Sequence, residues 1–540
     1  MEAMKALPLF FAFAVPLGAA PKPNIVLIMV DDMGFSDIRP YGGEIDTPNL
    51  DALARNGLRF SQFYNSARCC PTRATLMTGL HPHETGIGHM TGEQTASVGP
   101  LPAYSGNIND SCVTLAQVAK SAGYSTFMTG KWHLAGKDQA DWPLQRGFDR
   151  YYGCISGATH HFHPYDWRIM YDGNAPDPEP KSTGDRPFYT TDAFTDHAIR
   201  FIGEHEAGEK KDEPFFLYLA YTAPHWPLHA PDAELAKYRG KYGMGWDKLR
   251  EERYKKQLDS GLIPASWKLT PRDPEVPAWD SLDEKTRDES SGRMAAYAAM
   301  IDRVDQKIGD LLDTLKKHGD FENTLILFLS DNGACAEVSV TGKGDPVKDR
   351  APGTELTLPS YGKAWANASN TPHRLYKHFT HEGGTNTPFI AHWPARIKAG
   401  RDWCREPAQL IDVMPTVADL TGATYPAERN GKKVLPIDGI PLTPAFDGKP
   451  LARERSIFIE HENNASVRDG EWKLVGANIA LPRGIQKEKW ELYRISEDGT
   501  ELNDLAAKHP EKVAALVAEW EAWAKRVGVY PKPGGKGGKR

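Results

Sequence analysis

The chain has 540 residues, 40% of them hydrophobic, so it can bury a large core, and we expect one large domain with a smaller second one. Its formal net charge of −6 is small for this length and argues against a nucleic-acid-binding protein. After the N-terminal stretch, no segment approaches the ~20 consecutive apolar residues of a membrane-spanning helix.

The N-terminal segment, residues 1–20, is predicted to be a cleavable signal peptide. Lys5 precedes an apolar stretch from Ala6 to Leu17, and small residues follow at positions 18–20. An uncleaved membrane anchor is the alternative, but the stretch is too short to span a bilayer and prolines interrupt it. We therefore expect a secreted or periplasmic protein.

Three apolar runs predict strands that are buried on both faces. They are Asn24 to Val30, Pro214 to Ala220 and Thr324 to Leu329. Runs without alternation are typical of a parallel sheet that helices cover on both sides. Amphipathic helices are predicted over Asn49 to Asn56, Val113 to Ser121 and Arg293 to Lys317, the last ended by Gly319. Strands alternating with helices predict an α/β sandwich.

The composition changes near Phe446 to Glu454, and a smaller α+β domain is predicted beyond it. Its expected strands and final helix are Ile457 to Glu460, Trp472 to Val475, Trp490 to Ile495 and Pro510 to Val527. We therefore divide the chain into a main domain over residues 21–450, a C-terminal subdomain over 451–530 and a disordered tail over 531–540.

The run from Cys69 to Arg73 (CCPTR) carries the Cys-x-Pro-x-Arg spacing at which a cysteine is oxidised to Cα-formylglycine. From Cys69 the proline lies at i+2 and the arginine at i+4, and Cys70 fits neither position. In the hydrated aldehyde one hydroxyl attacks sulfur, and loss of the proton of the other expels sulfate, which divides the reaction into two easier steps. Pro71 suits the first turn of a helix whose N-terminal amides would face an anion. Arg73 is placed to hold the hydrate or metal-bound carboxylates.

Acidic pairs follow two of the predicted strands. Asp31 and Asp32 end the first, and Asp331 and Asn332 end the third. Ligands of open α/β sheets bind at the carboxyl ends of the strands, and an all-oxygen donor set suits Ca²⁺ better than zinc. Each pair alone would be read as turn residues, but together with the Cys69 motif they predict a calcium site. A two-metal zinc phosphatase would need histidines close to these carboxylates, and Asn332 follows Asp331 instead.

Lys131 and His133 end a predicted strand that begins at Gly123. Residues i and i+2 of a strand point to one face, so the two side chains would form an anion site. There Lys131 would neutralise sulfate oxygens and His133 would take a proton from the hydrate. Without the other motifs, Lys131 and His133 would be interpreted as solvent-exposed surface residues.

Further basic side chains lie in loops. His225 stands between two prolines after the strand from Pro214, where it could protonate a leaving oxygen. Lys377 precedes Gly383 and Gly384, which indicate a close backbone approach. Without the other motifs, His225 would be interpreted as a packed loop histidine and Lys377 as a surface lysine. The histidines in the loop before Pro164 are expected at the surface or rim rather than as ligands: His160, His161 and His163.

These features in this order resemble the formylglycine-dependent sulfatases of the alkaline-phosphatase superfamily, over Pro23 to about Val529. Asn24 to Gly79 and the segment GYSTFMTGKWH carry the resemblance most specifically. GIGHM, RLYKHFTHEGG and IEHENNASVRDGEWKLV are similar to bacterial arylsulfatases. The resemblance implies a large mixed, mostly parallel sheet sandwiched by helices, as in alkaline phosphatase, and a smaller C-terminal domain with an antiparallel sheet. The main domain would then be the catalytic sulfatase domain.

The resemblance also assigns roles, matched position by position. One Ca²⁺ would be held by Asp31, Asp32, Asp331, Asn332 and the formylglycine derived from Cys69. The catalytic residues would be Cys69, Arg73, His133 and His225. Lys131, His225 and Lys377 would contact the sulfate group. The implied partners are a sulfated small molecule or glycan and a formylglycine-generating maturation enzyme. Arg68 departs from the apolar or small residue that many members have there.

Two other functions remain open. A phosphate- or phosphonate-ester hydrolase would use the same hydrate, because tetrahedral oxyanions differ mainly in charge. A binding protein for sulfated glycans would keep Cys69 as a thiol. Binding alone would not require all of the ionisable side chains that the candidate site retains, which weighs against this alternative. If Cys69 is modified, five of the six cysteines remain, so at least one has no partner within the chain.

Overall fold

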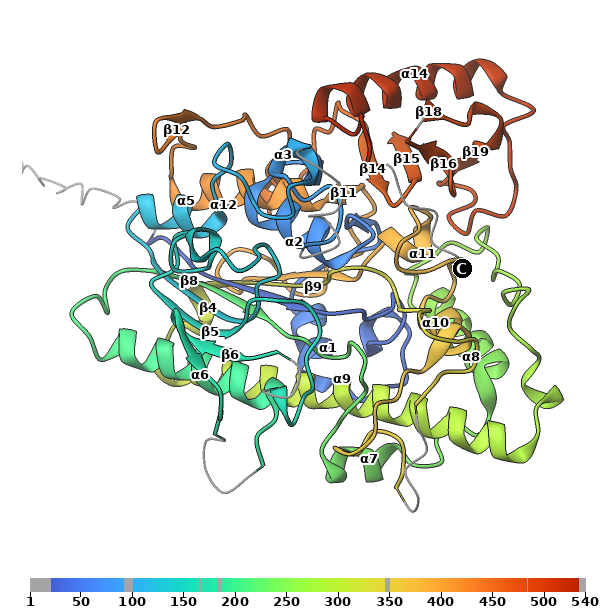
Figure 1. Cartoon of the computed structure of the whole chain (residues 1–540), viewed down its shortest axis with the longest axis horizontal. Helices are drawn as coiled ribbons and strands as arrows, with labels where there is room; N and C mark the ends of the chain where they lie inside the picture. The colour runs from blue at the N-terminus through green and yellow to red at the C-terminus, as the bar shows by residue number, and fades with distance from the viewer. Residues whose placement is uncertain are drawn as a thin grey trace, which may run out of the picture.

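The computed structural model describes residues 21–91, 101–164, 168–181, 187–344, 350–482 and 484–533. The predicted signal peptide and residues 534–540 of the predicted tail lie outside this part of the chain. The central feature is a sheet with the strand order β2-β10-β9-β1-β8-β4-β5-β6-β7 (Figure 1). Pairing is parallel from β9 to β5 and antiparallel towards both edges. The predicted mixed sheet with a parallel centre is confirmed.

The predicted central strands all form. The parallel strands are β9 (Thr324–Ser330), β1 (Asn24–Val30), β8 (Phe215–Ala220), β4 (Ser125–Lys131) and β5 (Arg150–Cys154). The edge strands are β2 (Leu58–Phe60), β10 (Phe389–His392), β6 (Met170–Asp172) and β7 (Ala175–Asp177). Every residue of β8 and β9 is buried, which explains why their sequences are largely apolar without alternation. Strand β4 is equally buried, although its sequence STFMTGK contains polar residues.

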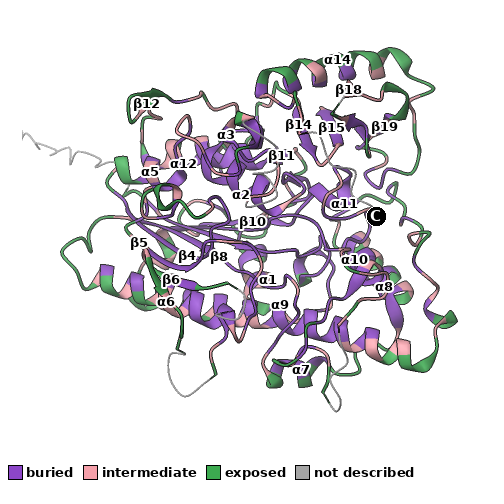
Figure 2. Cartoon of the chain, viewed as in Figure 1, coloured by how far each residue is buried: buried purple, intermediate pink, exposed green. Residues whose placement is uncertain are grey.

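Helices cover both faces of the sheet and close two separate cores. Val26 and Ile28 of β1 pack in the core with α6 (Thr190–Glu206) and α9 (Glu284–His318). The alternate residues Ile25 and Leu27 pack in the other core, with α2 (Cys69–Thr78), α5 (Leu115–Ser121) and α12 (Val413–Thr421). Figure 2 shows the sheet buried between exposed outer helix faces. The α/β sandwich expected from the sequence is therefore present.

Helix α9 is longer than predicted. It begins at Glu284, where the Asp283 side chain accepts a hydrogen bond from the amide of Thr286, and it ends at the left-handed Gly319. The prediction began at Arg293 because the preceding turns contain no apolar side chains, so they carry no apolar periodicity. The N-cap of a helix can thus lie well before its apolar stripe.

The remaining helices and strands connect and cover these layers. The helices are α1 (Pro48–Arg55), α3 (Pro82–Thr85), α7 (Asp232–Tyr238), α8 (Gly245–Asp259), α10 (Gly362–Ser369), α11 (Glu382–Thr385) and α13 (Thr443–Phe446). The small sheets are formed by β3 (Phe63–Tyr64) with β11 (Ala408–Gln409), β12 (Glu428–Arg429) with β13 (Lys432–Lys433), and β17 (Ala480–Leu481) with β18 (Gly484–Ile485).

The C-terminal part forms the predicted antiparallel sheet with a helix packed on it (Figure 1). Its strands are β14 (Ile457–His461), β15 (Asn464–Asp469), β16 (Trp472–Gly476) and β19 (Glu491–Arg494), and its helix is α14 (Pro510–Val527). Trp520 and Trp523 of α14 pack on Leu474 and Leu492. The sequence analysis did not predict β15, a short strand whose residues (NASVRD) are mostly polar. The domain boundary near residue 450 stays a prediction.

Among the described residues, the structure contains no helix both long enough and apolar enough to span a bilayer. All six cysteines carry free thiols, and five of them are buried.

Candidate active site

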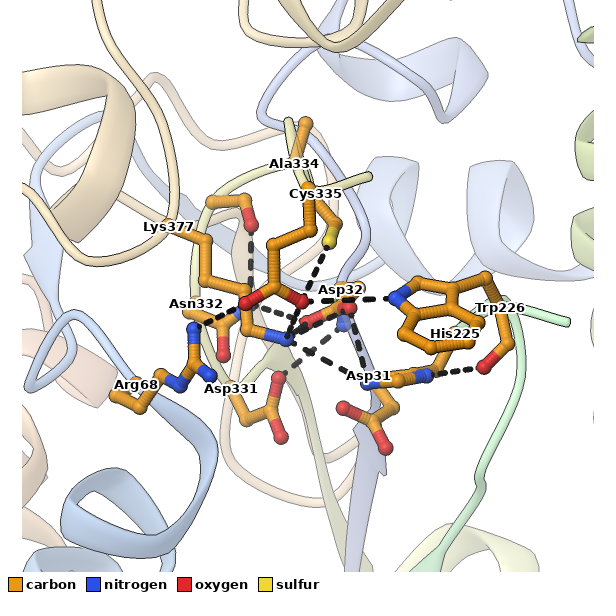
Figure 3. Close-up of polar contacts among 12 residues, drawn as sticks. Asp31, Asp32, Arg68, His225, Trp226, Asp331, Asn332, Ala334, Cys335 and Lys377 are labelled. Carbon is orange, nitrogen blue, oxygen red and sulfur yellow. Dashed lines mark hydrogen bonds and ion pairs between the residues drawn. The ribbon is translucent and has the colours of Figure 1, made fainter. Parts of the chain in front are cut away.

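The carboxyl ends of four adjacent parallel strands meet at one point of the sheet. There β9 is followed by Asp331 and β1 by Asp31, while β4 ends at Lys131. The loop after β8 adds His225. Figure 3 shows the acidic residues, His225 and Lys377 pointing toward one another. The strand order thus gathers side chains that lie hundreds of residues apart in sequence.

Oxygen donors form the floor of this pocket, and all of their side chains are buried: Asp31, Asp32, Asp331 and Asn332. The Asp32 amide donates to Asp331 Oδ1 at 3.2 Å, and Asn332 Nδ2 donates to Asp32 Oδ1 at 2.7 Å. Asp31 Oδ1 and Asn332 Oδ1 have no hydrogen-bond partner within the described chain. Burying an oxygen atom that accepts no hydrogen bond costs free energy of folding. These oxygens therefore fit as ligands of a hard cation such as Ca²⁺, which prefers oxygen ligands.

Basic side chains surround these carboxylates. Lys131 Nζ lies 2.6 Å from Asp31 Oδ2, and Arg73 Nη2 lies 2.8 Å from Asp331 Oδ2. Lys377 Nζ lies 2.8 Å from Asp32 Oδ1. The three cations balance the three carboxylates, so a bound dication would leave the pocket positive and suited to an anion.

The two innermost carboxylates titrate differently. Burial and the neighbouring Asp31 charge raise the pKa of Asp331 well above its usual range. Burial also opposes ionisation of Asp31, but Lys131, His225 and Arg73 together lower the pKa of that carboxyl. The crowding of negative charge on Asp331 is what a cation would relieve.

Cys69 is the first residue of α2 and is buried in the pocket, beside the acidic floor. The helix that Pro71 predicted is present, and Arg68 is its N-cap. The sulfur atom of Cys69, the sulfur atom of Cys70 and a ring nitrogen of His133 all lie within 4.8 Å of one another. A hydrogen bond from Cys70 lowers the pKa of Cys69 well below its usual range, although burial opposes this, and Lys131 and His133 lower it further.

His133 reaches Cys69 in a way that the sequence did not predict. Strand β4 ends at Lys131, and His133 lies beyond it with φ of 56°, so the argument that both residues share one face of a strand is wrong. The His133 amide donates to Ile155 O at 2.9 Å, which turns the ring toward the cysteines. His133 Nε2 lies 3.1 Å from Cys70 Sγ, and burial lowers the pKa of His133 to about 4. The imidazole is therefore neutral, as a proton acceptor must be.

His225 and Lys377 lie side by side over Asp32. His225 Nε2 is 3.4 Å from Asp32 Oδ2 and 3.5 Å from Lys377 Nζ. Lys377 is buried because its loop packs tightly: a Cβ on Gly333 would lie 1.8 Å from the carbonyl oxygen of Gly383. The close backbone approach that the glycines predicted is confirmed.

Two of the three loop histidines lie deeper than the surface or rim position that was predicted for them. His160 and His161 are buried, and His161 Nε2 lies 3.2 Å from the carbonyl oxygen of His225. Only His163 of this group is partly exposed. The prediction failed because the polar loop folds over the segment that carries His225 and is covered there.

Sequence reasoning also missed residues around the pocket. Cys70 contacts His133, and Tyr218 of β8 contacts Arg73 Nη1 at 3.4 Å. Glu337 accepts a hydrogen bond from Arg68 Nη1 at 2.8 Å. The one available signal for Glu337 is its place shortly after Asn332, on the segment that leaves the pocket floor.

Known proteins match this chain over most of its length. A family model described as Sulfatase matches residues 23–423, and one described as N-sulphoglucosamine sulphohydrolase, C-terminal, matches residues 372–522. The chain is 34% identical over 537 residues to an uncharacterized sulfatase of Schizosaccharomyces pombe, covering 95% of each. It is 33% identical to an arylsulfatase of Klebsiella aerogenes, covering 81% of this chain and 94% of the relative. The crystal structure of Ps i-CgsB in complex with k-i-k-neocarrahexaose superposes with a TM-score of 0.67 at 26% identity, covering 93% of each chain.

Proposed function

The chain belongs to the sulfatase family and is a sulfuric ester hydrolase, and from that premise we propose that it is a calcium-dependent enzyme whose nucleophile is a Cα-formylglycine made from Cys69. The observation that carries this proposal is the burial of Cys69 at the start of α2, beside an all-oxygen donor set with two unpaired oxygens. A structural cysteine would not need such surroundings.

Calcium fits the floor of the pocket. Asp31, Asp32, Asp331 and Asn332 would hold the ion, with an oxygen of residue 69 completing the set. The bound ion supplies positive charge that polarises the oxygens of the ester and favours an ionised nucleophile. Arg73 keeps the Asp331 carboxylate in place through its hydrogen bonds.

The hydrated aldehyde that residue 69 would carry would supply one hydroxyl to attack the ester sulfur, with cleavage of the S–O bond to the alcohol. Deprotonation of its second hydroxyl would break the C–O bond to the sulfate and restore the aldehyde. Lys131 and Lys377 neutralise the charge of the sulfate oxygens. His133 takes up the proton during sulfate release, which its neutral imidazole permits. His225 donates a proton to the leaving oxygen.

The substrates that we propose are sulfate monoesters of carbohydrates, with small aryl sulfates accepted as well. The support comes from a relative named arylsulfatase and from a structural neighbour whose crystal structure holds an oligosaccharide. We also propose that the chain is exported by residues 1–20 and that a maturation enzyme oxidises Cys69. The segment 1–20 has the composition of a signal peptide.

Mass spectrometry of the peptide that contains Cys69, together with kinetics, tests the proposal. Active material from a host with the maturation system should contain an aldehyde at position 69 and should hydrolyse aryl sulfates faster than aryl phosphates. Active protein with an intact thiol would refute the nucleophile. A large preference for phosphate would identify the rival esterase.

A further inference from the structure

Glu337 is an anionic residue beside the pocket to which the proposed chemistry gives no role. It lies on the segment that leaves Asn332, and its side chain is 27% exposed whereas that of Lys377 is 1% exposed. The two residues together line a cavity of about 270 Å³. Figure 3 shows Arg68, Trp226 and Lys377 around this side of the pocket. The carboxylate thus lies between the buried Lys377 and open space.

One carboxylate oxygen of Glu337 is fully occupied. Its Oε1 accepts from Arg68 Nη1 at 2.8 Å and lies 2.9 Å from His378 Nε2. Burial opposes ionisation, but Lys377, His378 and Arg68 hold the pKa of Glu337 well below its usual range. The Glu337 side chain is therefore ionised and held in one position by its partners.

The other oxygen accepts only weak or long hydrogen bonds. Oε2 accepts from the weak thiol donor Cys335 Sγ at 3.4 Å and from Trp226 Nε1 at 3.5 Å. Lys377 Nζ lies 3.8 Å away. None of these contacts is a strong hydrogen bond, so a better donor at a normal distance can compete for Oε2.

The cavity suits the organic part of a sulfate ester. Its lining combines Tyr376 and Phe379 with the charged residues Asp273, Glu275 and Lys363. Lys377 is proposed to contact the sulfate group, and its Nζ lies 3.8 Å from Oε2, so a group attached to that sulfate on the Glu337 side comes close to Oε2. A hydroxyl group there would donate to the carboxylate, whereas a second anionic group would be repelled.

We propose that Glu337 is a specificity-determining residue, which selects sulfate esters with a free hydroxyl group next to the ester and disfavours esters with a neighbouring carboxylate or second sulfate. This inference rests on the proposed function, because it assumes that sulfate binds at Lys377. The favoured substrate class is accordingly a singly sulfated polyol or sugar with a free neighbouring hydroxyl group.

The test compares three aryl sulfates in the mature, calcium-loaded enzyme: 2-hydroxy-5-nitrophenyl sulfate, 4-nitrophenyl sulfate and 2-carboxyphenyl sulfate. For each, kcat/KM is measured in the wild type and in Glu337→Gln. The ratio between two substrates is then compared between the two enzymes, which cancels the intrinsic reactivities of the substrates. Loss of a charged hydrogen bond should lower the preference for the hydroxyl ester about tenfold, and the carboxylate ester should gain by a similar factor.

Matched variants separate this role from a structural one. Glu204→Gln removes an exposed charge that pairs with Arg150 and should leave every ratio unchanged. If Glu337→Gln does not fold, Glu337→Asp keeps the charge but withdraws it, and should lose the hydroxyl preference while still disfavouring the carboxylate ester. An equal loss on all three substrates would overturn the inference and leave a purely structural Glu337. Absence of turnover in the wild type would instead refute the proposed function.

Discussion

Two of the buried charge clusters in the described part of the chain differ in an instructive way, because only one of the two has the features of a ligand site. In the junction cluster, where the C-terminal sheet meets the main domain, Lys473 Nζ lies 2.7 Å from Glu382 Oε1 and 3.0 Å from Glu501 Oε1. Tyr64 OH lies 3.2 Å from the second oxygen of Glu382, whose amide donates to the second oxygen of Glu501 at 3.0 Å. Each carboxylate oxygen there has a hydrogen-bond or ion-pair partner, and Glu501 Oε1, which accepts no hydrogen bond within the described residues, is paired with Lys473 alone.

The pocket cluster is equally buried and equally rich in ion pairs, yet Asp31 Oδ1 and Asn332 Oδ1 have no partner in the described chain. Neither burial nor charge distinguishes the two clusters. Unpaired oxygens do, because a folded protein tolerates them mainly where something else will bind. We therefore expect changes in the pocket to alter chemistry and changes in the junction to alter stability.

The largest effect is expected from Cys69→Ala. Loss of the nucleophile should lower kcat/KM on an aryl sulfate by a factor on the order of 10⁴ or more, while the melting temperature changes little. The control is Cys404→Ala, which removes a thiol beside the edge strand β2 and should keep wild-type rates. A Cys69→Ala variant that turns over at near wild-type rates would contradict the mechanism.

The second-largest effect is expected from removing the proposed Ca²⁺ ion. Chelation should inactivate the enzyme, and Ca²⁺ should restore activity better than Zn²⁺, since all protein donors are oxygens. Asp31→Asn should weaken calcium binding by at least about 100-fold in a calorimetric titration, a readout that needs no turnover.

Asp172→Asn is the control for calcium binding, because its carboxylate is exposed on β6 and pairs only with surface Arg200 among its described ion pairs. Calcium affinity that is unchanged in Asp31→Asn would remove this residue from the metal site. Strict dependence on zinc would overturn the whole donor assignment.

The sequence predicted the pocket floor because buried strands and the residues that end them are local features. Asp31 and Asp331 each follow a continuous apolar run, and parallel strands bring their carboxyl ends together. The turn at His133 and the burial of His161 depend instead on contacts with distant segments. Likewise, Glu337 acquires its place from Arg68, 269 residues away in the chain, and no local pattern encodes that pairing.

The third prediction tests the junction cluster. Lys473→Met should lower the free energy of unfolding by about 3–5 kcal/mol, because Glu382 and Glu501 would remain buried without their cation. Denaturant titration measures the loss, and the folded fraction should keep its kcat. Adding Glu382→Gln to this variant should recover part of the stability by removing one unpaired charge. A drop in kcat without a loss of stability would mean that the two clusters are not separate in function.

The smallest effect is a pH dependence at the same junction. Glu460 of β14 lies 2.9 Å from His83 Nε2 of α3 and accepts from the Asn463 amide at 3.1 Å. Burial opposes ionisation, but Lys532 and His83 outweigh it and lower the pKa of Glu460 to about 2, against an ordinary value of 4.5. The ionised form is thus favoured by folding.

Because the folded pKa lies below the unfolded one, the stabilisation from Glu460 is complete above pH 4.5 and is lost as the pH falls toward 2. The difference in unfolding free energy between the wild type and Glu460→Gln should therefore shrink by about 2–3 kcal/mol across that window. Denaturant titrations at a series of pH values measure this difference. Glu497→Gln, whose carboxylate is exposed, should show a nearly constant difference. A constant difference for Glu460→Gln as well would mean that its carboxylate does not stabilise the contact between the C-terminal sheet and α3.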